Sequence, residues 1–336
     1  MAVAPKDTLP QNLRQKARKE LHEDERHLRA HIESFQRWVN SLPHITYPKD
    51  PKLLLPFLRH AKYRHDKAQA RLDNFCTLRA SDLNGAPQWF HFPPVNDPIV
   101  NTYLKAGLMV ELGRTKDDVL ILLLRIAILF IRDKKLVGSW EPDILPMNLM
   151  RPLNYMNLER YLLDPVTQIA GYGLFLDMTG LNSRQLMHRK DKSEIKLEMK
   201  VFQEGLPLRV KHLIYYNEPA IVDVMFKLMD TWISDKIRQR MLRVKTNIDK
   251  AYDKVPGLKD LMPVEYGGKN GKLSDLIENH ARRFREFYSK PPPWIGVRVD
   301  ESKRPDSAKN YMREYKDVNV DIFGTKGTYI SLDPGD

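Results

Sequence analysis

The first part of the chain is rich in charge and places its apolar residues at helical spacing. Within residues 11–41 the apolar positions recur three and four residues apart, which predicts one amphipathic helix; they are Leu21, Leu28, Ile32, Phe35 and Val39. Residues 53–59 and 67–79 predict two further short helices. The proline-rich residues 86–98 predict a linker. We therefore expect a small helical domain over residues 10–92.

Beyond this linker, strand patterns alternate with helical patterns. Apolar runs predict strands at residues 119–131, 172–178 and 210–216. Helical stretches near residues 156–171 and 190–203 separate them. Such alternation is typical of an α/β sheet, which we place in a second domain of residues 99–275.

The C-terminal part contains one more helical pattern and then becomes polar. Residues 273–288 predict a helix, and the chain turns polar after three consecutive prolines at 291–293. We treat residues 276–336 as a C-terminal helix and polar tail. From residue 300 onwards we expect this tail to be poorly packed.

The helix predicted after Pro219 is apolar over most of its circumference. Its charges Asp223, Lys227 and Asp230 lie at i, i+4 and i+7 and form one narrow stripe. The pattern allows two interpretations: a helix buried on two sides of a core, or a lid that covers a lipid pocket and also meets a bilayer. The apolar positions are Ile221, Val222, Val224, Met225, Phe226, Leu228, Met229 and Trp232.

Basic residues accompany this apolar helix. A second helix is predicted to start at Ser234, and on it Lys236, Arg240 and Arg243 would share one face. Arg209 and Lys211 lie two apart at the start of a predicted strand and so point to the same side. This basic surface is either an ordinary solvated face or a docking surface for an anionic membrane.

The composition narrows the possible classes of protein. The chain has 336 residues, 42% of them hydrophobic, and a net charge of +12, which favours a polyanionic partner such as a membrane or a nucleic acid. The single cysteine, Cys76, excludes a disulfide framework. The N-terminus lacks a signal peptide's apolar core, and the longest apolar run falls short of the roughly 20 residues that span a bilayer. We therefore expect a cytoplasmic protein that associates peripherally with membranes.

Four separate blocks resemble the CRAL-TRIO lipid-binding family. Residues 205–219, GLPLRVKHLIYYNEP, are similar to the signature in which a strand ends in Asn-x-Pro and leads into a gate helix. The other blocks are LPFLR at residues 55–59, GLFLDMTGL at 173–181 and LMPVEYGG at 261–268. The similarity is greatest to the alpha-tocopherol transfer protein-like members. It implies a helical N-terminal domain followed by an α/β lipid-binding domain with a mixed sheet floor and a gate helix.

The resemblance also implies site residues. The residues implied to line the ligand pocket or its gate are Phe175, Tyr215, Ile221, Val224, Met225, Phe226, Met229 and Trp232. The residues implied to bind phosphoinositide head groups are Arg59, Arg209, Lys211 and Arg240. One basic position of the relatives aligns with Ala61, so Arg59 or Lys62 would take its place.

The chain departs from the family pattern at three places. Asp230-Thr231-Trp232 replaces the usual Lys-Pro-Phe at the end of the gate helix. Pro207-Leu208-Arg209 lacks the glutamate of members that bind phosphatidylinositol in the pocket. The first departure indicates a changed hinge, and the second argues against a phosphatidylinositol head-group site in the pocket. Residues 113–152 also follow the family poorly, so the pocket is expected to differ from that of tocopherol or retinaldehyde carriers.

The resemblance implies a non-enzymatic monomer that binds a small hydrophobic ligand, such as a tocopherol-, retinoid- or phospholipid-like molecule, and transfers it between membranes. The sequence contains no nucleophile elbow, zinc-protease motif, complete phosphate loop or dinucleotide fingerprint, and its histidines are scattered, so we expect neither cofactor nor metal. A membrane-bound adaptor with a degenerate pocket is an alternative. A nucleic-acid-binding protein is a weaker one, because aromatic residues are not interleaved with the basic positions.

Overall fold

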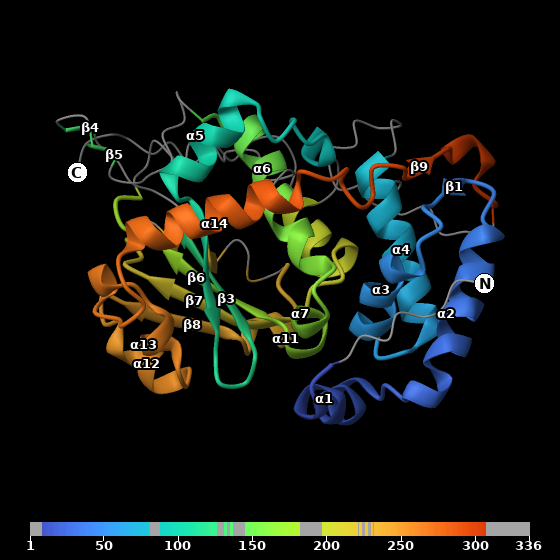
Figure 1. Cartoon of the computed structure of the whole chain (residues 1–336), viewed down its shortest axis with the longest axis horizontal. Helices are drawn as coiled ribbons and strands as arrows, with labels where there is room; N and C mark the ends of the chain where they lie inside the picture. The colour runs from blue at the N-terminus through green and yellow to red at the C-terminus, as the bar shows by residue number, and fades with distance from the viewer. Residues whose placement is uncertain are drawn as a thin grey trace, which may run out of the picture.

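A five-stranded mixed sheet lies at the centre of the protein in a computed structural model (Figure 1). The strand order is β2, β3, β6, β7, β8; β2 runs antiparallel to β3, and the other neighbours are parallel. The strands are β2 Met109–Arg114, β3 Leu120–Arg125, β6 Tyr172–Asp177, β7 Val210–Tyr216 and β8 Met241–Lys245. The structure describes residues 9–80, 88–125, 131–132, 135–136, 145–181, 197–220, 222–223, 226–227, 230 and 232–306.

Four helices form the N-terminal unit, on the side of Figure 1 where the N-terminus lies. They are α1 Gln11–Leu21, α2 Glu25–Asn40, α3 Leu55–His60 and α4 His65–Ala80. The prediction of one continuous helix over residues 11–41 is wrong. His22 adopts a left-handed conformation with φ 62°, and the Asp24 side chain then accepts a hydrogen bond from the Arg26 amide and caps a new helix.

The helices around the sheet follow the N-terminal unit along the chain. They are α5 Pro98–Ala106, α6 Met147–Leu162, α7 Pro165–Ala170, α11 Asp235–Arg238, α12 Asp249–Lys254, α13 Leu258–Leu261 and α14 Leu273–Phe287. The single helix expected at residues 156–171 is two helices, because Asp164 caps a new helix that has Pro165 in its first turn. The helix after Ser234 ends at Arg238, so the prediction of one continuous basic helix face is also wrong.

Short elements complete the fold. The long strand expected at residues 119–131 ends at Arg125, and β4 Ile131–Arg132 pairs separately with β5 Lys135–Leu136. The remaining short helices are η1 Pro51–Leu53, η2 Gln88–Phe90, η4 Val264–Tyr266, η5 Glu301–Lys303 and the π-helix η3 Val201–Gly205.

The C-terminal segment returns to the N-terminal unit. The strand β9 Arg298–Val299 pairs with β1 Ile45–Thr46. Arg304 is buried and forms ion pairs with Asp73 and Glu301, so a poorly packed tail does not begin at residue 300. The rest of the predicted tail, residues 307–336, lies outside the described residues.

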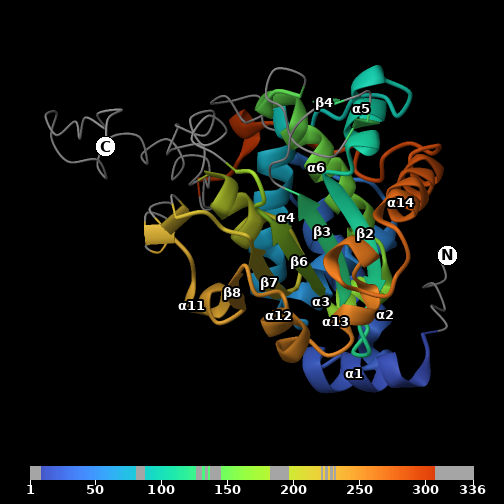
Figure 2. The same cartoon turned by 90° about the vertical axis from the view of Figure 1, so that its left-hand side faces the viewer.

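The two faces of the sheet pack against different helices. Leu122 and Leu174 belong to a core that includes α6; we call this side the α6 face. Leu123 and Phe175 belong to a second core with residues of α12 and α13; we call this side the α12 face. Figure 2 shows α6 on one side of the strands and α12 and α13 on the other. The mixed α/β architecture predicted from the sequence is thereby confirmed.

Candidate functional site

Three of the sequence blocks meet at the ends of β6 and β7. The Tyr266 hydroxyl donates to Asp177 Oδ2 over 2.6 Å, which joins the last block of the resemblance to the end of β6. Asn217, in a left-handed conformation with φ 51°, donates to Thr179 Oγ1 over 2.7 Å. These contacts fix where the chain leaves β7 to enter the segment after Pro219.

The block at residues 261–268 ends in two glycines, Gly267 and Gly268, which the local packing and backbone conformation require. A Cβ on Gly268 would lie 2.0 Å from the carbonyl oxygen of Met262, closer than any side chain allows. Gly267 has φ +72°, a backbone conformation that glycine adopts without strain. The Glu265 carboxylate, from the same block, accepts a hydrogen bond from the Leu273 amide at the start of α14. The block therefore connects the sheet to α14.

We call residues 219–233 the cap segment; its described residues Val222 and Phe226 pack on the α6 face. Val222 is fully buried, and the Phe226 ring meets the Tyr215 ring edge-on at 4.8 Å. The Arg243 guanidinium lies 4.4 Å from the centre of the Phe226 ring and pairs with Glu218 at 2.7 Å. The predicted residues Ile221, Val224, Met225 and Met229 lie outside the described residues.

The placement of Phe175 contradicts its expected role in lining the same pocket. In the parallel register, Phe175 pairs with Ile214, whereas Tyr215 pairs with Leu176. Successive residues of a strand point to opposite faces, so Phe175 points away from Tyr215. Its ring contacts Tyr216 and Tyr266 on the α12 face. Tyr172, Leu174 and Leu176 are the β6 residues that face the cap segment's side.

Basic side chains gather where the N-terminal unit meets the starts of β7 and β8. We call this group the cationic cluster; its members are Lys62, Arg71, Arg209, Lys211, Lys236 and Arg240. Arg209 and Lys211 donate to the same oxygen, Oε2 of Glu20, at 2.9 and 3.0 Å. This shared partner confirms that the two side chains point to one side of β7.

Two other members of the cluster bond to backbone carbonyls. Arg71 donates to the carbonyl oxygens of Gln203 and Leu206 at 2.7 and 2.8 Å, and Arg240 donates to that of Val210. Carbonyl bonds satisfy the donors but place no full negative charge beside them, although the charge of Glu204 also acts on Arg71. Arg243, expected beside Lys236, lies instead on β8 and pairs with Glu218.

Burial lowers the pKa values of basic side chains in the cluster, and neighbouring positive charges lower that of Lys236 further. Burial, followed by the charges of Arg240, Arg209, Arg71 and Lys62, lowers the pKa of Lys236 below its usual value. Burial lowers the pKa of Arg71 to about 10. Because each charge disfavours its neighbours, a bound anion would stabilise the whole cluster. We treat the cationic cluster as a candidate anion site.

Arg59 does not belong to this site, contrary to the sequence-based expectation. Its side chain is only 1% exposed, and Nε and Nη2 donate to Glu23 at 2.8 and 2.9 Å. Nη1 donates to Gln168 Oε1 at 2.7 Å. The break between α1 and α2 turns Glu23 inward and so creates this buried pair. Lys62, which is exposed just after α3, occupies the surface position instead.

Gln203 connects the cationic cluster to the cap segment. Its carbonyl accepts from Arg71, while its side chain donates to the Trp232 carbonyl at 2.9 Å and accepts from the Ser234 amide at 3.1 Å. Gln203 lies in the π-helix, an irregular element that is frequent at functional sites. The sequence pattern marks Lys236 but gives no sign of Arg71 or Gln203, because their roles depend on contacts between distant segments.

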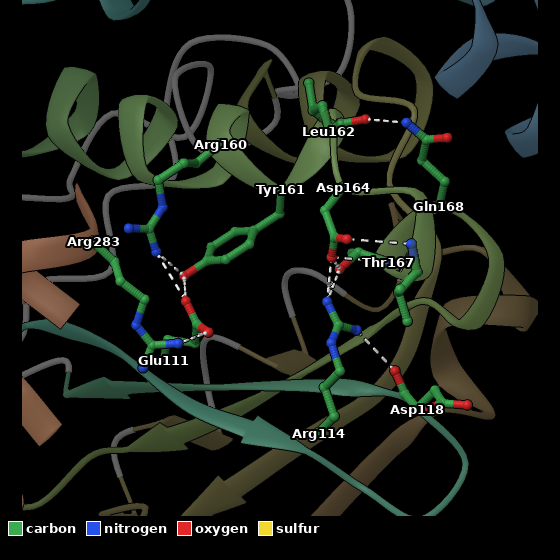
Figure 3. Close-up of polar contacts among 11 residues, drawn as sticks. Glu111, Arg114, Asp118, Arg160, Tyr161, Leu162, Asp164, Thr167, Gln168 and Arg283 are labelled. Carbon is green, nitrogen blue, oxygen red and sulfur yellow. Dashed lines mark hydrogen bonds and ion pairs between the residues drawn. The ribbon is translucent and has the colours of Figure 1, made fainter. Parts of the chain in front are cut away.

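A buried polar network holds β2 to the helices above it (Figure 3). Glu111 Oε2 accepts from Arg160 and from the Tyr161 hydroxyl, at 3.1 and 3.0 Å, and Oε1 accepts from Arg283 at 2.7 Å. Figure 3 also shows Arg114 reaching Asp164, the capping residue of α7. These contacts anchor α6, α7 and α14 to the edge of the sheet.

Two kinds of feature are absent from the residues that the structure describes: a metal-binding cluster and a membrane-spanning helix. No group of three or more histidine, cysteine, aspartate or glutamate residues there is arranged to hold a metal ion. Within the same ranges, no helix combines the length and the apolar character needed to cross a membrane.

Comparisons with known proteins agree with the motifs. Residues 105–268 match the family model described as CRAL/TRIO domain. The alpha-tocopherol transfer protein-like protein of Mus musculus is 25% identical over 274 residues, which cover 81% of this chain and 74% of that protein. Clavesin-2 of Rattus norvegicus is 22% identical over 259 residues, covering 76% of this chain and 73% of its own.

Among solved structures, the crystal structure of Sfh5 matches 80% of this chain and 91% of its own, at 13% identity and a TM-score of 0.44. The family match covers β2 to the glycine pair, and three of the four sequence blocks lie within it. The chain therefore contains a CRAL-TRIO domain, which spans residues 105–268.

Proposed function

We propose that this protein is a non-enzymatic carrier that encloses one small hydrophobic ligand and transfers it between membranes. The relatives named above include alpha-tocopherol transfer protein-like proteins, which supports a lipid cargo. The ligand would lie between the α6 face and the cap segment. Burial of apolar ligand surface supplies affinity at about 25 cal/mol per Å², so a carrier needs no catalytic group.

The cap segment supports this location. Phe226 packs edge-on against Tyr215, and both belong to the same apolar core. We propose that Leu174, Leu176 and Tyr215 form the floor of the ligand site. The residues proposed for its cover are Ile221, Val224, Met225, Phe226, Met229 and Trp232.

The cationic cluster is the single observation that carries the membrane-docking part of the proposal. Its six basic side chains share one ion-paired carboxylate, Glu20, among the described residues. A phosphoinositide head group carries several negative charges and matches such a site. At about 1 kcal/mol for each basic side chain near an anionic leaflet, the cluster would hold the protein reversibly on a cytoplasmic membrane surface.

Docking and ligand release can be coupled through Gln203. A head group that draws Arg71 toward itself weakens the bond between Arg71 and the Gln203 carbonyl. The Gln203 side chain holds the end of the cap segment at Trp232 and Ser234. A membrane would thus favour the open cap because head-group binding competes with a contact of the closed state.

Vesicle binding tests the docking surface. The triple variant Arg209→Ala/Lys211→Ala/Arg240→Ala is expected to lose most binding to phosphatidylcholine vesicles that contain phosphatidylinositol bisphosphate. A variant with the same charge change at exposed sites, Lys250→Ala/Lys254→Ala/Lys290→Ala, is expected to bind like the wild type. Equal binding by the two variants would refute the assignment.

A second variant guards against loss of structure. Arg209 and Lys211 also hold Glu20 on α1, so their removal can disturb the fold. Lys62→Ala/Lys236→Ala changes only exposed members of the cluster and is expected to weaken vesicle binding as well. Native mass spectrometry of the purified wild type, followed by identification of any released lipid, tests the carrier function itself. A protein that never carries lipid would be an adaptor.

A further inference from the structure

Tyr172, the first residue of β6, has a buried hydroxyl group without a hydrogen-bond partner among the described residues. Its side chain is 1% exposed and belongs to the core on the α6 face. Two other buried tyrosines in the described ranges have hydrogen-bond partners. Tyr103 donates to Asn154 Oδ1 at 2.8 Å, and Tyr161 donates to Glu111 Oε2 at 3.0 Å. Tyr172 is therefore unusual in its environment.

A buried hydroxyl that bonds to nothing costs free energy relative to its hydrated state, and folded proteins rarely leave one in place. Burial alone raises the pKa of Tyr172 well above 10, so its hydroxyl keeps its proton and can both donate and accept. No charged group of the described residues contributes to this shift. The described residues around the hydroxyl therefore form an uncharged environment, and none of them offers it a hydrogen bond.

The position of Tyr172 coincides with one end of the proposed ligand site. Its ring packs edge-on against Phe202 of the π-helix at 6.4 Å. The next residue of the π-helix, Gln203, holds the end of the cap segment at Trp232. Tyr215 pairs with Leu176, four residues further along β6, which is about 13 Å at the usual rise of a strand.

We propose that the Tyr172 hydroxyl forms a hydrogen bond with an uncharged oxygen atom of the bound lipid. The inference rests on the carrier function proposed above and specifies its cargo. The lipid would carry a hydroxyl or carbonyl group at the Tyr172 end and extend an apolar chain toward Tyr215 and Phe226. A carboxylate or phosphate does not fit this position, because an unpaired charge is costly in an uncharged apolar site.

Uptake of two matched lipids tests the proposal. Full-length wild-type protein and Tyr172→Phe are incubated with phosphatidylcholine vesicles that contain radiolabelled 1-hexadecanol or hexadecane, and the lipid retained by the protein is counted. The substitution removes only the hydroxyl oxygen. Retention of hexadecanol by Tyr172→Phe is expected to fall roughly threefold to tenfold, the range for one hydrogen bond, while hexadecane retention stays unchanged.

The outcomes separate this inference from the carrier function. Equal retention of hexadecanol by both proteins, or an equal fall for both lipids, would overturn the hydrogen bond and leave the carrier function intact. A wild type that takes up neither lipid would overturn both.

The thermal stability of the lipid-free protein tests the proposed role of Tyr172 independently of lipid uptake. Tyr172→Phe is expected to unfold at the same or a higher temperature than the wild type, because it removes an unsatisfied group. Tyr103→Phe, which deletes a satisfied hydroxyl, is expected to lower the unfolding temperature. A lowered temperature for Tyr172→Phe would show that another part of the chain already satisfies this hydroxyl, and would overturn the proposal.

Discussion

Replacement of Glu23 by alanine is expected to destabilise the protein strongly through Arg59. The Arg59 and Glu23 side chains are only 2% and 5% exposed, and Tyr63 also donates to Glu23, at 2.7 Å. Removal of one partner of a buried ion pair leaves an uncompensated charge and costs about 3–5 kcal/mol. This is a large fraction of a typical free energy of unfolding, about 5–15 kcal/mol.

Urea denaturation followed by circular dichroism measures the loss. The double variant Glu23→Met/Arg59→Met replaces the pair by apolar groups and is expected to recover most of the stability lost in Glu23→Ala. A loss below about 1 kcal/mol in Glu23→Ala would refute the reasoning, since the buried guanidinium would then have another means of compensation. The folded double variant should bind phosphoinositide vesicles like the wild type; loss of binding would return Arg59 to the docking surface.

Three further predictions concern the fold. Burial lowers the pKa of His280 well below 6.5, so the native imidazole stays neutral and only the unfolded state takes up a proton as the pH falls below 6.5. We therefore expect this residue to lower the free energy of unfolding by about 1 kcal/mol between pH 7.5 and 5.5. His280→Gln should show a smaller pH dependence in urea titrations. Gly268→Ala should be at least about 1 kcal/mol more destabilising than Gly267→Ala in the same assay, because only the former drives a Cβ into Met262; equal losses would contradict this. Cys76 is fully buried and burial raises its thiol pKa, so a thiol reagent should label it only in denaturant; fast labelling of the native protein would disprove its burial.

Much of the fold could be predicted because its signals are local. The strands at residues 172–178 and 210–216 and the last helix near residues 273–288 agree with β6, β7 and α14 within one residue at each end. Continuous apolar runs and helical periodicity depend only on neighbours in the sequence. The strand β8 was missed although its residues 242–245 alternate between apolar and basic, because basic residues at helical spacing suggested a longer helix.

The features of the candidate site that could be predicted are likewise the ones whose signals are local in the sequence. The pattern of residues by itself determined that an apolar segment follows Pro219 and that Arg209 and Lys211 share one side of a strand. It could not determine that Phe175 faces away from Tyr215, since that depends on the register between two strands. Nor could it determine that Arg59 is buried, because its partner Glu23 is 36 residues away.

The sequence by itself thus determined the family, the order of its elements and the supply of basic and apolar side chains, all of which are encoded in short runs of residues. Only the tertiary structure decided which of these side chains share a surface. Arg71, Lys236 and Gln203 come together because helices and strands from distant segments pack side by side. The hydroxyl of Tyr172 is left without a partner for the same reason, since burial depends on every element around it.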